Sequence, residues 1–231
     1  LLDSHNDYDI VARQKGALGV RLIARGPGGH GAYPWHCDNP IDKLIDGYLR
    51  FRETWRNPAS ESEWGDTMSA CMMRAGTANN QIPGEASLCL DFRYVEDSHK
   101  DAILESLRRI TGLEVETIKS IPAVFNDVDD PEMRRLRDVF ARRFPDRRIG
   151  FADLCGATDS VHWVRLGVPV AVIGVRGDGL HSACEWADLD SIDAYASALE
   201  EFVLSKAETK QGISAAPRAT EKGAPLSENA S

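Results

Sequence analysis

The order of strand-like and helix-like patterns between residues 16 and 120 constrains this fold more than any other feature. Apolar side chains alternate with other side chains in several stretches, and this period of two predicts strands. The predicted strands are 19–25, 67–74, 86–93 and 113–118. Two stretches with helical spacing lie between the first and second strands and between the third and fourth. This order is typical of a ferredoxin-like βαββαβ unit, an antiparallel sheet with both helices on one face.

Both predicted helices carry start signals. Asn39 precedes Pro40, which combines an N-cap residue with a proline at the first helical position. Ser98 is followed three residues later by Asp101, so we predict that Ser98 caps the second helix in a capping-box arrangement. An outer strand of such a sheet has free backbone groups, so pairing with a second copy of the chain is favoured.

Residues 121–205 follow a different pattern. Asp130 and Pro131 predict a helix start, and a last helix is predicted over about 189–203. The continuous apolar run 168–175 is typical of a strand buried on both faces, and the mixture of strand and helix indicates part of an open α/β sheet. Residues 206–231 contain few apolar side chains and are predicted to form a disordered tail.

Composition excludes two classes of partner. The net charge is -9, and the clustered arginines read as a solvated helix face, so no nucleic-acid-binding surface is predicted. No run of about eighteen apolar residues occurs, so no membrane span is predicted. The five cysteines are odd in number and form no CxxC pair, which disfavours a disulfide framework and indicates the cytoplasm.

Two residues are candidate metal ligands. His181 follows the apolar run, in the position where open α/β sheets place their sites, and neutral imidazole is a common zinc ligand. The alternative is an ordinary surface-loop histidine. Asp3 follows two leucines and is either a carboxylate that reaches a metal or an ordinary residue at a strand end.

His30 and Asn80 are candidate ligand-binding residues in loops. Glycines flank His30 and let the backbone approach another group closely, and its imidazole has the chemistry to donate to an oxyanion. Asn80 joins two predicted strands, and its amide either binds a polar ligand or is a common turn residue. Taken singly, each is better explained as an ordinary loop residue.

Two further candidates could bind a carboxylate. Arg93 either holds a substrate carboxylate with two hydrogen bonds or pairs with the neighbouring Asp91. Gly156 and Thr158 lie in a glycine turn that leads into a helix, where backbone amides favour anions, although every helix has such a start.

Taken together, these motifs occur in one characteristic order. They are Lys15-Gly16, then 28–34 around His30, then 80–83, then 91–93, then 156–159, then His181 with Glu185. This order resembles the aminoacylase/carboxypeptidase family of dinuclear-zinc hydrolases, which includes acetylornithine deacetylase, succinyl-diaminopimelate desuccinylase and the glutamate carboxypeptidases. The likeness covers about residues 1–205.

The resemblance implies a domain division. Residues 1–15 would end the first catalytic segment, and 16–120 would be the lid, or dimerisation, domain. Residues 121–205 would be the C-terminal part of an open α/β metallohydrolase domain, with 206–231 as the tail. A homodimer through the lid is then expected.

The resemblance also implies a role for each candidate residue. His30 would reach the partner subunit's active site and stabilise the oxyanion, while His181 and Asp3 would bind metal. The substrate would be held by Asn80, Arg93, Gly156 and Thr158. Two zinc ions, with cobalt or manganese as substitutes, would serve hydrolysis of an N-acyl amino acid or small peptide.

The chain also departs from that family. The family's His-x-Asp pair, bridging Asp and Glu-Glu pair are not present in recognisable context. We therefore expect an incomplete and inactive portion of such an enzyme. The alternative is a non-catalytic dimerising or ligand-binding module derived from the family.

Overall fold

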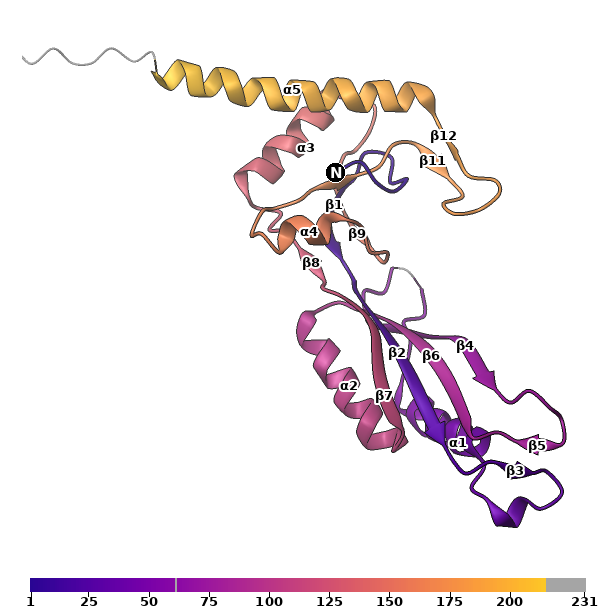
Figure 1. The fold of residues 1–231 in the computed structure, drawn as a ribbon. Helices are drawn as coiled ribbons and strands as arrows, with labels where there is room; N and C mark the ends of the chain where they lie inside the picture. Colours follow the sequence, from indigo (N-terminus) through magenta and orange to yellow (C-terminus); the bar gives the residue numbers. More distant parts are fainter. Residues whose placement is uncertain (61, 215–231) are drawn as a thin grey trace, which may run out of the picture.

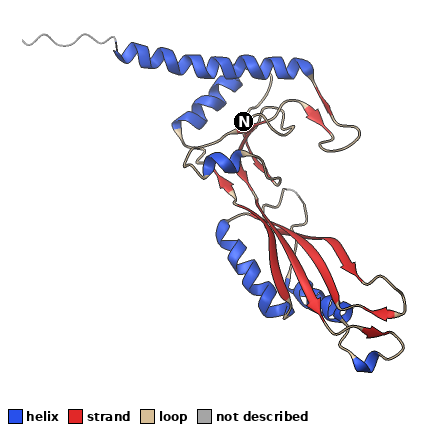
Figure 2. Cartoon of the chain, viewed as in Figure 1, coloured by secondary structure: helices blue, strands red, loops and turns tan. Residues whose placement is uncertain are grey.

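A computed structural model describes residues 1–60 and 62–214 of the chain, with side chains to residue 205. Figure 1 shows two parts joined at a narrow waist, and Figure 2 shows that each part combines a sheet with helices. The lid, the lower part in Figure 1, contains the elements from β2 to β7. The other elements form the α/β part.

The lid is built from six main elements and three short ones. The main ones are β2 (Gly16–Arg25), α1 (Pro40–Thr54), β4 (Thr67–Ala75), β6 (Glu85–Tyr94), α2 (Asp97–Thr111) and β7 (Glu114–Ile121). The short ones are β3 (Gly29–His30), η1 (Pro34–His36) and β5 (Gln81–Ile82). The antiparallel sheet has the order β4-β6-β2-β7, which confirms the predicted ferredoxin-like unit.

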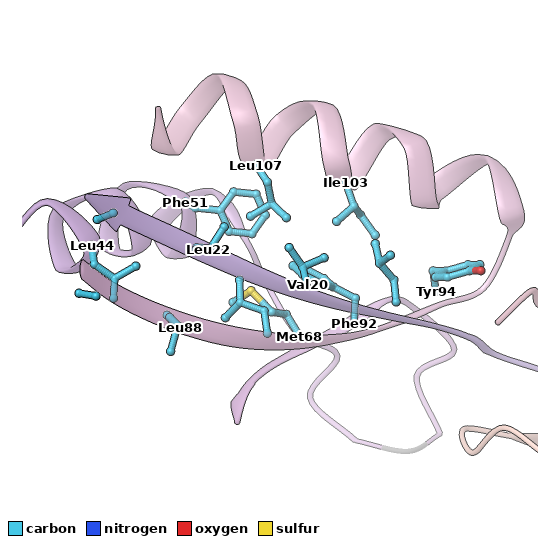
Figure 3. Packing of buried hydrophobic residues seen from close by; sticks show 14 residues of the cluster. Val20, Leu22, Leu44, Phe51, Met68, Leu88, Phe92, Tyr94, Ile103 and Leu107 are labelled. Atoms are coloured by element: carbon cyan, nitrogen blue, oxygen red, sulfur yellow. The ribbon is translucent and has the colours of Figure 1, made fainter. Parts of the chain in front are cut away.

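Alternate residues of β2 and β6 form the lid core, as their period of two predicted. Val20 and Leu22 of β2 point with Leu88 and Phe92 of β6 toward the two helices, where they meet Leu107 of α2 (Figure 3). Burying an aliphatic or aromatic side chain of this size contributes about 1.5–3 kcal/mol each. The opposite face of the sheet carries the polar side chains and no helix (Figure 2).

The two helix starts turned out differently. Asn39 caps α1 as predicted, because its side-chain oxygen accepts a hydrogen bond from the Ile41 amide at 3.0 Å. The prediction for Ser98 is wrong, since α2 begins at Asp97, two residues earlier than a cap at Ser98 implies, and its N-cap residue Glu96 makes no side-chain cap. Asp97 instead accepts a hydrogen bond from the Ala123 amide at 2.9 Å, a contact between distant segments that no local motif indicates.

The α/β part contains a small mixed sheet, a separate two-stranded sheet formed by β11 and β12, and three helices. Its elements are β1 (Ile10–Gln14), β8 (Val124–Phe125), α3 (Pro131–Arg143), β9 (Phe151–Leu154), α4 (Ser160–Val164), β10 (Val172–Ile173), β11 (Gly177–Asp178), β12 (Trp186–Ala187) and α5 (Leu189–Ser214). Strand β1 lies at the centre, parallel to β9 and antiparallel to β8 and β10. Helices α3 and α5 pack against this sheet through Phe140 and Tyr195.

Two predictions for this part need correction. The apolar run 168–175 forms only the two-residue strand β10, and Val168 is exposed, because few neighbouring strands are present to extend the pairing. The tail predicted from residue 206 starts too early, since helix α5 continues to Ser214. The remaining residues 215–231 lie outside those that the structure describes.

Asn126 ties three segments of the α/β part together. Its side-chain amide donates to the carbonyls of Ala12 at 3.3 Å and Val170 at 3.0 Å, and its side-chain oxygen accepts from the Val170 amide at 3.2 Å. The residue is buried, so loss of its side chain would leave the amide and carbonyl of Val170 without these partners, while the Ala12 carbonyl would keep its bond from the backbone amide of residue 126.

We therefore expect Asn126→Ala to lower the free energy of unfolding by about 2–3 kcal/mol. Urea denaturation followed by circular dichroism would measure the change. Ser197→Ala, which removes an exposed hydroxyl on α5, is the control and should change the value by less than about 0.5 kcal/mol. Equal effects of the two variants would contradict the role of Asn126.

At the waist the chain passes twice between the two parts. Strand β1 leads into β2 through Lys15 alone, and β7 leads into β8 over residues 121–124. Lys15 is buried, and the charged groups of Arg13 and Lys15 each lie 5.0 Å from the ring centroid of Trp64 in the lid. Arg13 also pairs with Asp153 of β9, so this series of contacts links the lid to the α/β sheet.

Tyr94, at the end of β6, packs against Gly16 on the lid side of the waist. Its ring covers Gly16 so closely that a Cβ at that position would overlap it. Burial raises the pKa of Tyr94 to about 12, so the hydroxyl stays protonated and donates to the Ile121 carbonyl at 2.6 Å. Glycine at position 16 is thus required by packing.

Candidate functional site

His30 lies at the end of the lid farthest from the waist (Figure 1). Strand β3 pairs with β5, which places His30 opposite Gln81. The Ala32 amide donates to Nδ1 of His30 at 3.1 Å. Because Nδ1 accepts that bond, the neutral imidazole carries its proton on Nε2. The side chain is exposed, so this N–H is available to an external oxygen.

Asn80 lies beside His30. Its backbone carbonyl accepts from the Gly31 amide at 2.8 Å, in the turn that leads into β5. Gly28 has a positive φ of 66°, a backbone conformation that glycine adopts without strain. The glycine-flanked loop therefore brings the predicted residues His30 and Asn80 together.

Arg93 is distant from these two residues. We call the end of the lid that carries β3 and β5 the tip. Arg93 lies near the waist end of β6, whereas Glu85, at the other end of this strand, lies next to the tip. The eight residues of strand between Glu85 and Arg93 span about 27 Å, so Arg93 is about that far from the tip. The Nε of Arg93 donates to Oδ1 of Asp91 at 2.7 Å. Of the two alternatives for Arg93, the pairing with Asp91 is the one present in the structure.

Thr158 already has a partner for both of its donors. Its amide and its hydroxyl both bond to the side-chain oxygen of Gln14, at 3.1 and 2.7 Å, and Ser160 donates to the same oxygen at 3.2 Å. Gln14 is only 1% exposed, and its Nε2 has no hydrogen-bond partner in the structure. Gly156 is exposed at the start of this turn.

His181 and Asp3 lie in the α/β part. His181 has a positive φ of 62° in the loop between β11 and β12, and its amide donates to the Glu185 carboxylate at 3.0 Å. Asp3 is exposed, and its amide donates to the Ile173 carbonyl at 3.3 Å. The tip with His30 and the loop with His181 lie at opposite ends of the molecule (Figure 1).

The residues that the structure describes do not fit a zinc site on their own. No group of three or more His, Cys, Asp and Glu side chains in this part of the chain is placed to hold a metal ion. A structural or catalytic zinc ion takes about three or four protein ligands, more than His181 and Asp3 supply.

Several residues beside the predicted site residues carry little signal in the sequence. Gln14 organises the Gly156 turn, and its only sequence signal is a polar residue at the end of the apolar run from Ile10 to Ala12. The aromatic residues beside His30 are Tyr33, Trp35 and His36, and the exposure of the first two is evident only in the structure. A groove of about 590 Å³ between α1 and α2 contains none of the predicted site residues.

Comparison with known proteins matches the lid to one described family of domains. Residues 12–116 match the family described as Peptidase dimerisation domain. Succinyl-diaminopimelate desuccinylase from Ehrlichia chaffeensis is 22% identical over 197 residues, which cover 84% of this chain and 52% of that protein. The enzyme of the same name from Gluconacetobacter diazotrophicus is 27% identical over 206 residues, with the same coverage.

Solved structures share the fold. A tripeptidase from Staphylococcus aureus has a TM-score of 0.72 and 15% identity, and aminopeptidase PepT from Bacillus cereus has 0.69 and 17%. Each comparison covers 87% of this chain and 54% of the other. These matches support the prediction from the motif order that the chain is a member of the aminoacylase/carboxypeptidase family. It spans about half the length of the curated relatives that it matches.

No helix among the described residues is both long enough and apolar enough to cross a membrane.

Proposed function

We propose that the protein takes part in hydrolysing the amide bond of an N-acyl amino acid or small peptide. The observation that carries this proposal is the geometry of His30, whose Nδ1 is held by the Ala32 amide while Nε2 keeps a proton in an exposed position. A fixed N–H of this kind is suited to stabilise the oxyanion of a tetrahedral intermediate. Membership of a hydrolase family supports the same reaction.

His30 would act in the active site of a partner subunit. Within one copy, the tip that carries His30 lies at the opposite end from the loop with His181 (Figure 1). A second copy in the reverse orientation would bring one copy's tip toward the other's α/β part, because an isologous pair is related by a two-fold axis.

His181 and Asp3 would contribute to a site for zinc, with cobalt or manganese as substitutes. The remaining ligands and the general base would come from polypeptide beyond the residues described. Asn80, Arg93, Gly156 and Thr158 would bind the substrate, which requires Arg93 to leave Asp91 and Thr158 to exchange Gln14 for a substrate oxygen. The cytoplasm is the expected location.

The direct test is to assay two proteins with added zinc, the 231-residue chain and the longest open reading frame that contains it. N-acetyl and N-succinyl amino acids are the substrates, and bound zinc is measured in parallel. We expect the longer protein to cleave at least one of them and the 231-residue chain to cleave none. Cleavage and stoichiometric zinc binding by the chain alone would overturn the expectation of an inactive portion.

A second candidate function is a non-catalytic dimerising or ligand-binding module. The observation that favours it is that the described residues do not form a metal site. Absence of cleavage by either protein, together with a stable dimer, would support this function over hydrolysis.

The two edges of the lid sheet differ as dimer surfaces. Edge strand β7 carries Glu114, Glu116 and Lys119, and charges of this kind protect an edge from pairing. Edge strand β4 contains a single charged residue, Arg74, and exposes the apolar side chains of Met72 and Met73. We therefore propose that a second copy pairs along β4.

Symmetry restricts the possible registers of that pair, and we propose the centred one. An antiparallel pair of identical strands has its two-fold axis at one residue or between two, and Cys71 is the midpoint of Thr67–Ala75. In the centred register Arg74 faces Met68 of the second copy, so like charges do not meet. Residues directly opposite in such a pair have Cα atoms about 4.5–5.5 Å apart, so two Cys71 thiols would be neighbours.

Cross-linking tests this arrangement. In a variant with Cys37, Cys155 and Cys184 changed to serine, a short bis-maleimide should join two chains through the exposed Cys71. The matched control moves the thiol to the other edge, as Cys71→Ser with Ile118→Cys, where the exposed position on β7 should give little product. Stronger cross-linking through position 118 would contradict the choice of β4.

A further inference from the structure

Three aromatic side chains gather beside His30. They form the tip cluster, which consists of Tyr33, Trp35 and His36. The Tyr33 ring lies 5.6 Å from the ring of His30, 6.1 Å from that of Trp35 and 5.9 Å from that of His36, measured between centroids. The cluster therefore extends directly from the proposed oxyanion donor.

The tip cluster does not contribute to either core. Tyr33 is 52% exposed and Trp35 is 73% exposed, and η1 contains no buried residue. Its backbone is nevertheless held in place, since the Tyr33 amide donates to the His30 carbonyl at 2.9 Å and the His36 amide to the Tyr33 carbonyl at 3.1 Å. Pro34 restricts the backbone further. Rigid, exposed aromatic groups of this kind are typical of binding surfaces.

The two loops that form the tip, 26–37 with the cluster and 75–84, contain no acidic residue, lysine or arginine. The first charged residue after the cluster, Asp38, is paired with Lys43 at 2.9 Å. A succinyl or other acidic group in contact with these loops would therefore find no lysine or arginine in them, whereas an apolar group would find aromatic faces.

We propose that Trp35, with Tyr33, contacts an apolar or aromatic side chain of the substrate next to the carbonyl that His30 approaches. This inference rests on the proposed function, and it makes Trp35 a specificity residue of the site. Preference for apolar over acidic substrates follows from the aromatic faces and the lack of Lys or Arg in the tip loops.

The test compares Trp35→Ala, Trp35→Phe and the parent protein, each made from the longest open reading frame that contains this chain. For N-acetylphenylalanine, kcat/KM should fall about 10–100-fold in Trp35→Ala and recover largely in Trp35→Phe, because an apolar contact of this size discriminates to that extent. For N-acetylglycine, which has no side chain to contact Trp35, the value should stay within about two-fold. Equal losses for both substrates, no loss, or a preference for N-acetylaspartate would overturn the inference.

Binding measurements separate this inference from the proposed function. Isothermal titration of N-acetylphenylalanine into the same proteins should show the weaker binding of Trp35→Ala even without turnover. Absence of cleavage with Trp35-dependent binding would reject hydrolysis and keep the contact with Trp35. If N-acyl amino acids are cleaved but neither their binding nor their kcat/KM changes in Trp35→Ala, the proposed hydrolysis stands and the proposed contact with Trp35 is rejected.

Discussion

Replacing His30 with alanine is expected to lower kcat by about 10²–10³ in the active protein, the usual loss for one oxyanion donor. KM should change little, since the negative charge that Nε2–H stabilises develops only in the transition state. Steady-state kinetics with the best N-acyl amino acid would measure both constants. His162→Ala, which removes an exposed histidine in the α/β part, is the control and should leave kcat unchanged.

The Ala32 contact sharpens this prediction. Because the Ala32 amide holds Nδ1, the donor must be Nε2, and His30→Gln should recover part of the lost activity if its amide reaches the same oxygen. An unchanged kcat in His30→Ala would reject the oxyanion role, whatever the activity of the protein.

Mixing two inactive variants shows whether His30 acts across the dimer. A mixed dimer of one His30→Ala subunit and one His181→Ala subunit would contain one site with both histidines intact if the tip serves the partner subunit. If both residues act within one subunit, every site in the mixture lacks one histidine. Recovery of activity on mixing is expected from the opposite positions of the two residues in one chain (Figure 1).

Placing a charge at the centre of β4 should separate the dimer. Cys71→Asp would place two carboxylates face to face at the proposed two-fold axis, and like charges in an interface cost several kcal/mol. A cost of about 3 kcal/mol would raise the dissociation constant of the dimer more than about 100-fold. Sedimentation equilibrium would measure the change.

Two control variants show whether the charge acts through the proposed β4 interface. Cys71→Ser keeps a small uncharged side chain and should leave the dissociation constant close to that of the parent protein. Ile118→Asp adds a carboxylate to the opposite edge strand, β7, and should also leave it unchanged. If Ile118→Asp separates the dimer and Cys71→Asp does not, the second copy pairs along β7. Because both positions are exposed, neither charge is expected to unfold the lid.

The lid could be predicted because its determinants are local. The period of two in β2 and β6 and the Asn39-Pro40 start of α1 depend on neighbouring residues, and the structure confirms each. The start of α2 could not be predicted in this way, since Asp97 bonds to Ala123 after the chain has passed through α2 and β7. The motif order likewise predicted the family that the comparisons support, because that order depends on the sequence alone.

What the sequence by itself determined is therefore the βαββαβ unit, the family and the set of candidate residues. The tertiary structure alone decided which candidates meet. His30 and Asn80 meet because β3 pairs with β5, whereas Thr158 bonds to Gln14, 144 positions away in the chain. The apolar run after residue 168 became a two-residue strand because strand length depends on neighbouring strands. Contacts of this range arise from packing of the whole chain, so residue patterns in a short window do not contain them.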